Sequence, residues 1–238
     1  MEKTIRAGII GCGKVAPFHA SAYQKIENCE VCAFYDVQEE RAEAMARQYN
    51  AKAYTSIERM VKENGLDVVS VCTPHPIHRE AAVAALNCGA NIAIEKPLAS
   101  SLEDCDLILE AAERNNATGT AICQRRFFPP SLRIRQAIDE GKIGTPILGT
   151  VNMYGWRDMA YYASDPWRGT WKGEGGGVLV NQAPHQLHLF TTQAIYNTAL
   201  AFMLHNEADD VFVDILGFRA NFRRRLSERP APDPLSNL

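Results

Sequence analysis

The sequence lacks an excess of either charge, because 25 Lys and Arg stand against 28 Asp and Glu and leave a net charge of −3 with neutral His. A general nucleic-acid or anionic-membrane binder needs a basic excess, so both classes of protein are disfavoured. No segment reaches the roughly 18 consecutive apolar residues that a membrane span requires. The first residues also lack the apolar run and cleavage site of a secretory signal. We therefore expect a cytoplasmic protein.

An even set of cysteines is also missing. The seven Cys all lie between Cys12 and Cys123, and an odd number in a chain of this size is typical of reduced thiols rather than of a disulfide framework. Cys29 and Cys32 form a C-x-x-C, and one interpretation is a redox pair. No helix start follows Cys29 to activate its thiol, so two structural thiols at the start of a strand are the favoured interpretation.

What is present is the composition of an ordinary globular protein, with 46% apolar and 22% charged residues. The 238 residues correspond to about one and a half average domains. The first half alternates short apolar runs with helical patterns, which predicts an α/β fold: a doubly wound parallel sheet with helices on both faces. Strands are expected at 6–10, 30–35, 66–72, 91–94 and 120–123, and helices at 14–26, 38–49, 56–63, 78–88 and 102–116.

The pattern changes near Gln124, where we place a boundary between a dinucleotide-binding domain (1–123) and a second, incomplete α+β domain (124–238). In the second domain we expect a helix at 131–140, a strand at 147–154 and a helix from 178 to about 194. An irregular aromatic stretch, 155–171, lies between the last two.

A glycine-rich loop follows the first expected strand. Gly11, Gly13 and Ala16 form G-x-G-x-x-A, with Lys14 and Val15 inside the motif, and a helix follows. In a dinucleotide fold the first Gly makes the tight turn, the second admits the pyrophosphate, and the small third residue lets the helix pack closely. The helix N-terminus offers free N–H groups to the phosphates. The alternative is a glycine-rich turn of an unrelated α/β protein.

Asp36 ends the second expected strand, about 20 residues beyond the loop, where a carboxylate binds the adenosine ribose hydroxyls. The same carboxylate repels a 2′-phosphate, and neither Val37 nor Gln38 is basic. The cofactor predicted from these residues is NAD, and NADP is disfavoured.

Two later strands also end in marked motifs. Thr73-Pro74-His75-Pro76-Ile77-His78 follows the expected strand at 66–72, and Glu95-Lys96-Pro97 follows the expected strand at 91–94. Ligands of open α/β sheets bind beyond the carboxyl ends of the strands, which places Lys96 near a reacting group. By position alone, a solvated surface lysine is the more common explanation of such a residue.

Taken together, the motifs resemble those of the Gfo/Idh/MocA oxidoreductases, the glucose–fructose oxidoreductase and inositol dehydrogenase group. The resemblance covers about residues 5 to 190. It rests on G-C-G-K-V-A, C-T-P-H-P-I-H and E-K-P-L-A, and in the second half on Q-R-R-F, G-K-I-G, W-R-G-T-W and G-G-G-V-L followed by His185.

This resemblance implies roles for individual residues. Lys96 and His185 would be catalytic, with His185 taking a hydroxyl proton while hydride leaves for NAD. Asn181, one helical turn before His185, and Arg126 would contact substrate together with that pair. The cofactor would be contacted by the loop residues above and by Thr73, Pro74, His78, Glu95, Lys96, Trp167 and Arg168.

Two other interpretations of His185 remain open. It lies on a helix with several leucines and is compatible with a packed core residue. With His188 it has the i, i+3 spacing of a metal pair, but no third ligand is evident from the sequence and no metal is expected. His188 also stands where relatives carry Asp.

The pattern of the family is lost after about Phe190, and only 48 residues follow. We expect a truncated second domain with a disordered, Pro-rich tail at 218–238, for which a frameshift or early stop is one hypothesis.

The resemblance predicts hydride transfer from a secondary alcohol of a sugar, cyclitol or nucleotide sugar to NAD. The alternatives are an NAD-dependent glycoside hydrolase of the same fold and a catalytically defective NAD-binding fragment. The expected partner is a small-molecule substrate, with no nucleic acid and no membrane, and relatives form homo-oligomers.

Overall fold

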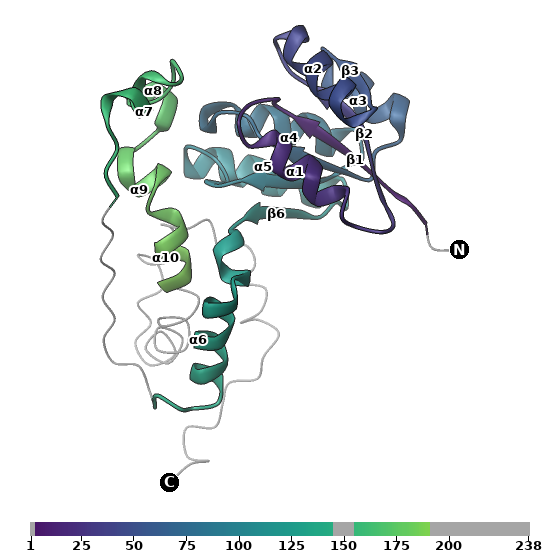
Figure 1. Ribbon diagram of the computed structural model, residues 1–238. Coiled ribbons are helices and arrows are strands. Elements are labelled where there is room, and N and C mark those ends of the chain that lie inside the picture. The colour runs from purple at the N-terminus through teal and green to yellow at the C-terminus, as the bar shows by residue number, and fades with distance from the viewer. Residues whose placement is uncertain (1–2, 145–154, 191–238) are drawn as a thin grey trace.

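The computed structural model describes residues 3–144 and 155–190 (Figure 1). Six parallel strands form one sheet in the order β3-β2-β1-β4-β5-β6. The α/β class and the parallel sheet predicted from the sequence are confirmed. The strands are β1 (Ile5–Ile10), β2 (Cys29–Tyr35), β3 (Lys52–Tyr54), β4 (Val68–Val71), β5 (Asn91–Glu95) and β6 (Gly119–Ile122).

Helices cover both faces of the sheet, and an apolar core lies under each set. α1 (Ala16–Tyr23) and α2 (Glu39–Tyr49) pack on one face through Ala16, Ala20 and Met45. α3 (Ile57–Asn64), α4 (His78–Asn87) and α5 (Leu102–Arg114) supply the larger core on the other face. Strands buried on both faces explain the continuous apolar runs in the sequence.

Helix ends follow the local sequence. The Ser56 hydroxyl caps α3 by accepting from the Arg59 N–H at 3.3 Å, and the Ser101 hydroxyl caps α5 by accepting from the Asp104 N–H at 3.1 Å. α1 begins at Ala16 and is shorter than the predicted 14–26. Strand β3 has three residues with no distinctive pattern, and it was not predicted.

The strand register places the ligand-binding motifs along one edge. Ile10 pairs with Tyr35 and with Val71, and Val71 pairs with Ile94. The residues that follow these strand positions therefore leave the sheet at the same end, as the carboxyl ends of parallel strands do. They include Gly11, Asp36, Cys72 and Glu95.

We call the residues from Gln124 onward, which follow β6 and Cys123, the second region. The domain boundary near Gln124 stays a prediction. The helices of the second region are short: a 3-10 helix η2 (Gln124–Phe127), then α6 (Pro129–Asp139), α7 (Met159–Ala163), α8 (Trp171–Glu174), α9 (Gly177–Asn181) and α10 (Pro184–Phe190). Figure 1 shows α6 and α10 extending away from the sheet beyond β6. Helices α7 and α8 lie at the opposite end of α9 from α10.

The single helix predicted from 178 to about 194 is wrong. The structure has two helices, because Pro184 lacks an N–H and disfavours a helical conformation at Ala183. The part of that prediction beyond Phe190, the predicted strand at 147–154 and the tail at 218–238 all lie outside the described residues. No helix within residues 3–144 and 155–190 combines the length and apolar character needed to cross a bilayer.

Candidate functional site

The glycine-rich loop has two glycines that serve different purposes. Gly11 has φ +90°, and a Cβ atom on it would lie 2.8 Å from the carbonyl carbon of Cys72 and 2.9 Å from the N atom of Thr73. A Cβ atom on Gly13 would meet nothing within 4 Å. Gly11 is therefore required by the fold, whereas Gly13 leaves open space at the N-terminus of α1. Such a space beside free backbone N–H groups fits a pyrophosphate.

Asp36 is buried and fixed to this loop. Its Oδ2 accepts from the Cys12 N–H at 2.7 Å, and its Oδ1 accepts from the Gln38 N–H at 2.9 Å. Each carboxylate oxygen keeps a second acceptor site. Val37, the next residue, is 78% exposed and carries no charge. These contacts fit the predicted recognition of a ribose without a 2′-phosphate.

His78, predicted to contact the cofactor, has a different position. Its side chain is fully buried, with Nδ1 2.9 Å from the Pro97 carbonyl oxygen and Nε2 2.9 Å from the Thr73 carbonyl oxygen. Burial lowers the pKa of His78, although its contacts with the carbonyls oppose this shift. The ring thus connects the loop after β4 with the loop after β5 through these two backbone carbonyls. The Thr73 hydroxyl is buried and has no hydrogen-bond partner within the described ranges.

His75 is a residue that the sequence reasoning did not select. It is buried, its Nδ1 lies 3.3 Å from the Glu174 carbonyl oxygen, and its ring centroid is 5.4 Å from that of Trp167. Burial, reinforced by the charges of Lys96 and Arg168, lowers the pKa of His75 to about 4. A His between two prolines directly after a buried strand was the available signal. His75 docks the second region onto the sheet edge beside the predicted cofactor loop.

Lys96 lies at the end of β5, and the Lys96–Pro97 peptide is cis. Its ammonium donates to the Asn181 carbonyl oxygen at 2.5 Å. Burial lowers the pKa of Lys96, and the Glu95 carboxylate opposes the shift. Glu95, predicted to contact the cofactor, instead directs Oε1 to His19 Nε2 at 3.0 Å. The structure therefore brings Lys96, from the sheet, directly against α9.

His185 lies on α10, near enough to Lys96 for the charge of the lysine to affect its pKa. Its Nδ1 is buried without a hydrogen-bond partner among the described residues. Burial is the largest cause that lowers the pKa of His185 to about 4, and the positive charges of Lys96 and Arg125 add to it. The imidazole is consequently neutral at neutral pH, with an acceptor nitrogen unused.

The expected arrangement of Asn181 and His185 on one helix face does not hold, because the chain breaks between α9 and α10. The Asn181 side chain turns to Glu174 and donates to its Oε1 at 2.6 Å. Only the Asn181 carbonyl faces Lys96. The side chain is thus buried in the second region.

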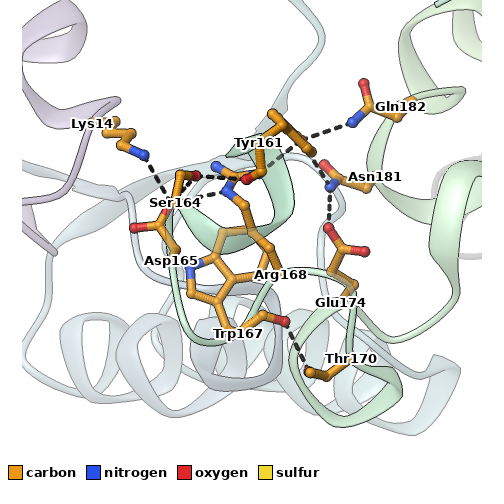
Figure 2. Close-up of polar contacts among 10 residues, drawn as sticks. All are labelled: Lys14, Tyr161, Ser164, Asp165, Trp167, Arg168, Thr170, Glu174, Asn181 and Gln182. Atoms are coloured by element: carbon orange, nitrogen blue, oxygen red, sulfur yellow. Dashed lines mark hydrogen bonds and ion pairs between the residues drawn. The ribbon is translucent and has the colours of Figure 1, made fainter. Parts of the chain in front are cut away.

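A polar chain in the second region connects these groups, as Figure 2 shows. The Lys14 ammonium lies 3.0 Å from Asp165 Oδ2, which also accepts from Arg168 Nε at 2.9 Å. Arg168 donates to the Tyr161 hydroxyl at 2.7 Å, and Gln182 donates to the same hydroxyl at 2.8 Å. The predicted cofactor residues Lys14 and Arg168 are therefore linked through one carboxylate.

The side chains of Trp167 and Arg168 also stack, with the guanidinium carbon 4.5 Å from the Trp167 ring centroid. Nearby, a cavity of about 250 Å³ opens within the second region. Buried Glu174 and Asn181 contribute its polar lining. The remaining lining residues are Tyr162, Gly169, Thr170, Trp171, Gly177, Val178 and Gln182.

Arg126, predicted to contact substrate, is exposed on η2, and its guanidinium carbon lies 5.6 Å from the Phe127 ring centroid. η2 packs against α10, and burial together with the charge of Arg126 lowers the pKa of His188. Within residues 3–144 and 155–190, no three His, Cys, Asp or Glu side chains are grouped to hold a metal. The thiols of Cys29 and Cys32 are free, and burial raises the pKa of both.

Two family models match the chain. Residues 5–121 match the Gfo/Idh/MocA model described as an oxidoreductase family with an NAD-binding Rossmann fold, and residues 131–221 match the Gfo/Idh/MocA C-terminal domain. The second match continues past Phe190, so the expectation that the resemblance to the family stops there is wrong.

Individual relatives agree with this match. An oxidoreductase of Formosa agariphila is 30% identical over 193 residues, which are 79% of this chain and 60% of the relative. Inositol 2-dehydrogenase of Salmonella typhimurium is 31% identical over 149 residues, 61% of this chain and 44% of the relative. The WlbA dehydrogenase of Bordetella pertussis, solved with NADH and UDP-GlcNAcA, superposes with a TM-score of 0.76 at 27% identity, over 81% of this chain and 56% of that one. The chain spans about half the length of the relatives it matches.

Proposed function

Because the chain belongs to the Gfo/Idh/MocA family of oxidoreductases, we propose that it acts as an NAD-dependent dehydrogenase on a secondary alcohol of a sugar, cyclitol or nucleotide sugar. One observation carries this proposal. A half-buried lysine that follows β5 and a neutral histidine with an unpartnered ring nitrogen on α10 lie close enough for the charge of Lys96 to lower the pKa of His185. The inositol dehydrogenase of Salmonella typhimurium and the nucleotide-sugar complex of WlbA support the substrate class.

The cofactor would be held by the first region. The space at Gly13 and the N-terminus of α1 receive the pyrophosphate, and Asp36 accepts hydrogen bonds from the ribose hydroxyls. The unpartnered Thr73 hydroxyl is a donor for the part of the cofactor beyond the pyrophosphate. When bound, NAD supplies the acceptor for the hydride.

The chain's own residues then handle the proton and the developing charge. His185, unprotonated at neutral pH, accepts the hydroxyl proton at an imidazole nitrogen. The Lys96 ammonium donates to the substrate oxygen and stabilises the negative charge that develops on it. An ammonium has three N–H donors, so Lys96 can keep the Asn181 carbonyl while it contacts substrate.

A panel of sugars, inositols and nucleotide sugars, followed by NADH absorbance, tests the proposal. We expect Lys96→Met and His185→Asn each to lower kcat by about 100-fold or more, with NAD binding retained. Lys62→Met, which removes an exposed lysine of α3, is the matched control and should match the unmodified protein. Full activity in both site variants would contradict the assignment.

The same panel separates the alternatives. Cleavage of a glycoside without net NADH would favour the hydrolase. NAD binding without turnover on any compound would favour a non-catalytic NAD-binding chain.

A further inference from the structure

A chain of hydrogen bonds lies under α1 and ends at the residue before Lys96. The Tyr23 hydroxyl is 2.9 Å from Ser70 Oγ, Ser70 Oγ is 2.9 Å from His19 Nδ1, and His19 Nε2 is 3.0 Å from Glu95 Oε1. Ser70 has no exposed surface and interrupts the otherwise apolar strand β4. The proposed chemistry uses neither Tyr23, Ser70 nor His19, so their burial needs another explanation.

When the His19 imidazole is neutral, this chain of hydrogen bonds has one consistent set of donors. The Glu95 carboxylate only accepts, so His19 donates from Nε2. A neutral imidazole then accepts at Nδ1 from the Ser70 hydroxyl, and Ser70 Oγ accepts from the Tyr23 hydroxyl. Every proton in this chain of hydrogen bonds has an acceptor, and the last acceptor is the negatively charged Glu95 carboxylate. A fully satisfied buried network of this kind holds its members in one arrangement.

The last member of the chain is Glu95. Burial alone would raise the pKa of Glu95, but the hydrogen bond from His19, the largest opposing cause, and the charge and N–H of Lys96 bring it below its ordinary value. The other Glu95 oxygen accepts from the Lys96 N–H at 3.3 Å. The charge of Glu95 also affects the pKa of four other groups, which are Cys72, His78, Cys123 and His185.

Lys96 in turn depends on Glu95. Burial lowers the pKa of Lys96, and the Glu95 carboxylate is the largest influence in the opposite direction. Of the other charged groups that face Lys96, Arg168 lowers its pKa, whereas Cys123 and Glu174 raise it; His185 lies on α10 in the same field. Glu95 is thus the principal anion that opposes the lowering of the Lys96 pKa.

We propose that His19 is a positioning residue for Lys96, held in its orientation by Ser70 and Tyr23 and acting by fixing the Glu95 carboxylate beside the lysine. The catalytic meaning of this role rests on the proposed function. The electrostatic effect on Lys96 does not, and it is measurable without any substrate.

Competitive labelling of all lysines with acetic anhydride across a pH series, read by mass spectrometry on the full chain, provides the test. We expect His19→Leu to lower the pH midpoint for labelling of Lys96 by about one unit, because the Glu95 carboxylate loses the donor that fixes its orientation and interacts less with the lysine ammonium. His19→Gln offers an amide donor and an acceptor, and should keep the midpoint near that of the unmodified protein. Exposed Lys25 is the internal reference and should not change.

A second pair of variants tests the far end of the chain. Tyr23→Phe removes the terminal donor and should give a smaller shift of Lys96 in the same direction. Tyr49→Phe is its matched control, because the Tyr49 hydroxyl contacts Ser21 and the Pro17 carbonyl of α1 and takes no part in this chain of hydrogen bonds. Ser70→Ala carries the test if His19→Leu fails to fold.

The outcomes are distinct. A folded His19→Leu or Ser70→Ala protein whose Lys96 labels at the unmodified midpoint overturns the proposal. A shifted Lys96 in a protein that turns over no alcohol keeps the positioning role and rejects the proposed function. Where turnover is measurable, the alkaline limb of the pH–rate profile should move to lower pH by the same amount as the labelling midpoint.

Discussion

The two regions of the molecule are held together by different forces. Residues 3–122 contain both apolar cores, whereas in the described part of the second region the only buried hydrophobic residues are Ile138 and Ala183, and each keeps 8% of its surface exposed. There, large apolar side chains such as Trp171, which is 84% exposed, face outward. Polar contacts to Lys14, His75 and Lys96 attach this region to the sheet edge. The first region is thus stabilised by its own packing, whereas the placement of α8 and α9 depends on polar contacts with His75 and Lys96.

The largest expected effect is in the core of the first region. Phe34 has no exposed surface and its ring lies 5.6 Å from that of Tyr49, so Phe34→Ala should lower the free energy of unfolding by about 3–5 kcal/mol. Trp171→Ala, a larger truncation at an exposed position, should cost less than about 0.5 kcal/mol. Denaturant unfolding followed by circular dichroism measures both. Similar losses in the two variants would contradict the contrast between the regions.

The glycine loop gives the next largest effect. Gly11→Ala places a methyl group against the backbone of Cys72 in a left-handed conformation and should destabilise the fold by about 2–3 kcal/mol. Gly13→Ala meets no protein atom, so it should leave stability unchanged and weaken NAD binding. Thermal unfolding and calorimetric titration with NAD separate the two results. A Gly13→Ala protein that binds NAD normally would argue against the pyrophosphate site.

The junction at His75 should respond to pH. The pKa of His75 is about 4 in the folded protein, below the ordinary value of 6.5, so the unfolded state binds more protons between these values. Stability should therefore fall as the pH is lowered from about 6.5 to about 4, and this group should account for a loss of about 2 kcal/mol between pH 7 and pH 5. His75→Phe keeps a ring beside Trp167 and should reduce that loss. Unfolding midpoints at pH 7 and pH 5 provide the comparison, and an unchanged pH dependence would count against it.

A smaller effect is expected from the hub of the second region. Tyr161→Phe leaves Arg168 and Gln182 without their acceptor and should destabilise α9 locally by about 1 kcal/mol, which is about fivefold faster amide exchange there. Exchange in the sheet should not change. Tyr162→Phe is the control, since no hydrogen bond of its hydroxyl is seen in the described residues. Equal acceleration in both regions would show that they unfold together.

The smallest effect belongs to the exposed ion pair. The Lys14 side chain is 62% exposed where it meets Asp165, so Lys14→Met should cost at most about 0.5 kcal/mol, and high salt should remove the difference. Unfolding at two salt concentrations tests this. A larger cost that salt does not screen would mean that the pair is more shielded from solvent than its exposure indicates.

Much of the first region could be predicted, because its signals are local. Ser56 and Ser101 each stand at a helix start with the N–H that they cap three residues on, and β-branched runs mark the buried strands. Strand β3 was not predicted, because a strand of three residues at the edge of the sheet needs no distinctive pattern of apolar residues. The break before α10 had a local signal in Pro184 and was predicted incorrectly.

The site was less predictable, because its contacts join residues far apart in the chain. His19 and Glu95 are 76 positions apart, and His75 and Glu174 are 99 apart. The motifs selected Lys96 and His185 as candidate catalytic residues. They could not show that the His78 side chain would be fully buried. Two weak signals for the buried chain existed: a histidine three residues after buried Ala16 on α1, and a serine inside the apolar run of β4.

The contact between Lys96 and residue 181 is made through a backbone carbonyl, which every amino acid possesses. Sequence drift at that position therefore cannot remove the lysine's partner as long as the helix ends in the same place. The Asn181 side chain is released for a separate task inside the cavity, where it meets Glu174. Selection can then alter the lining of the cavity and the anchoring of the lysine independently, which makes this position a natural starting point for engineering new specificity.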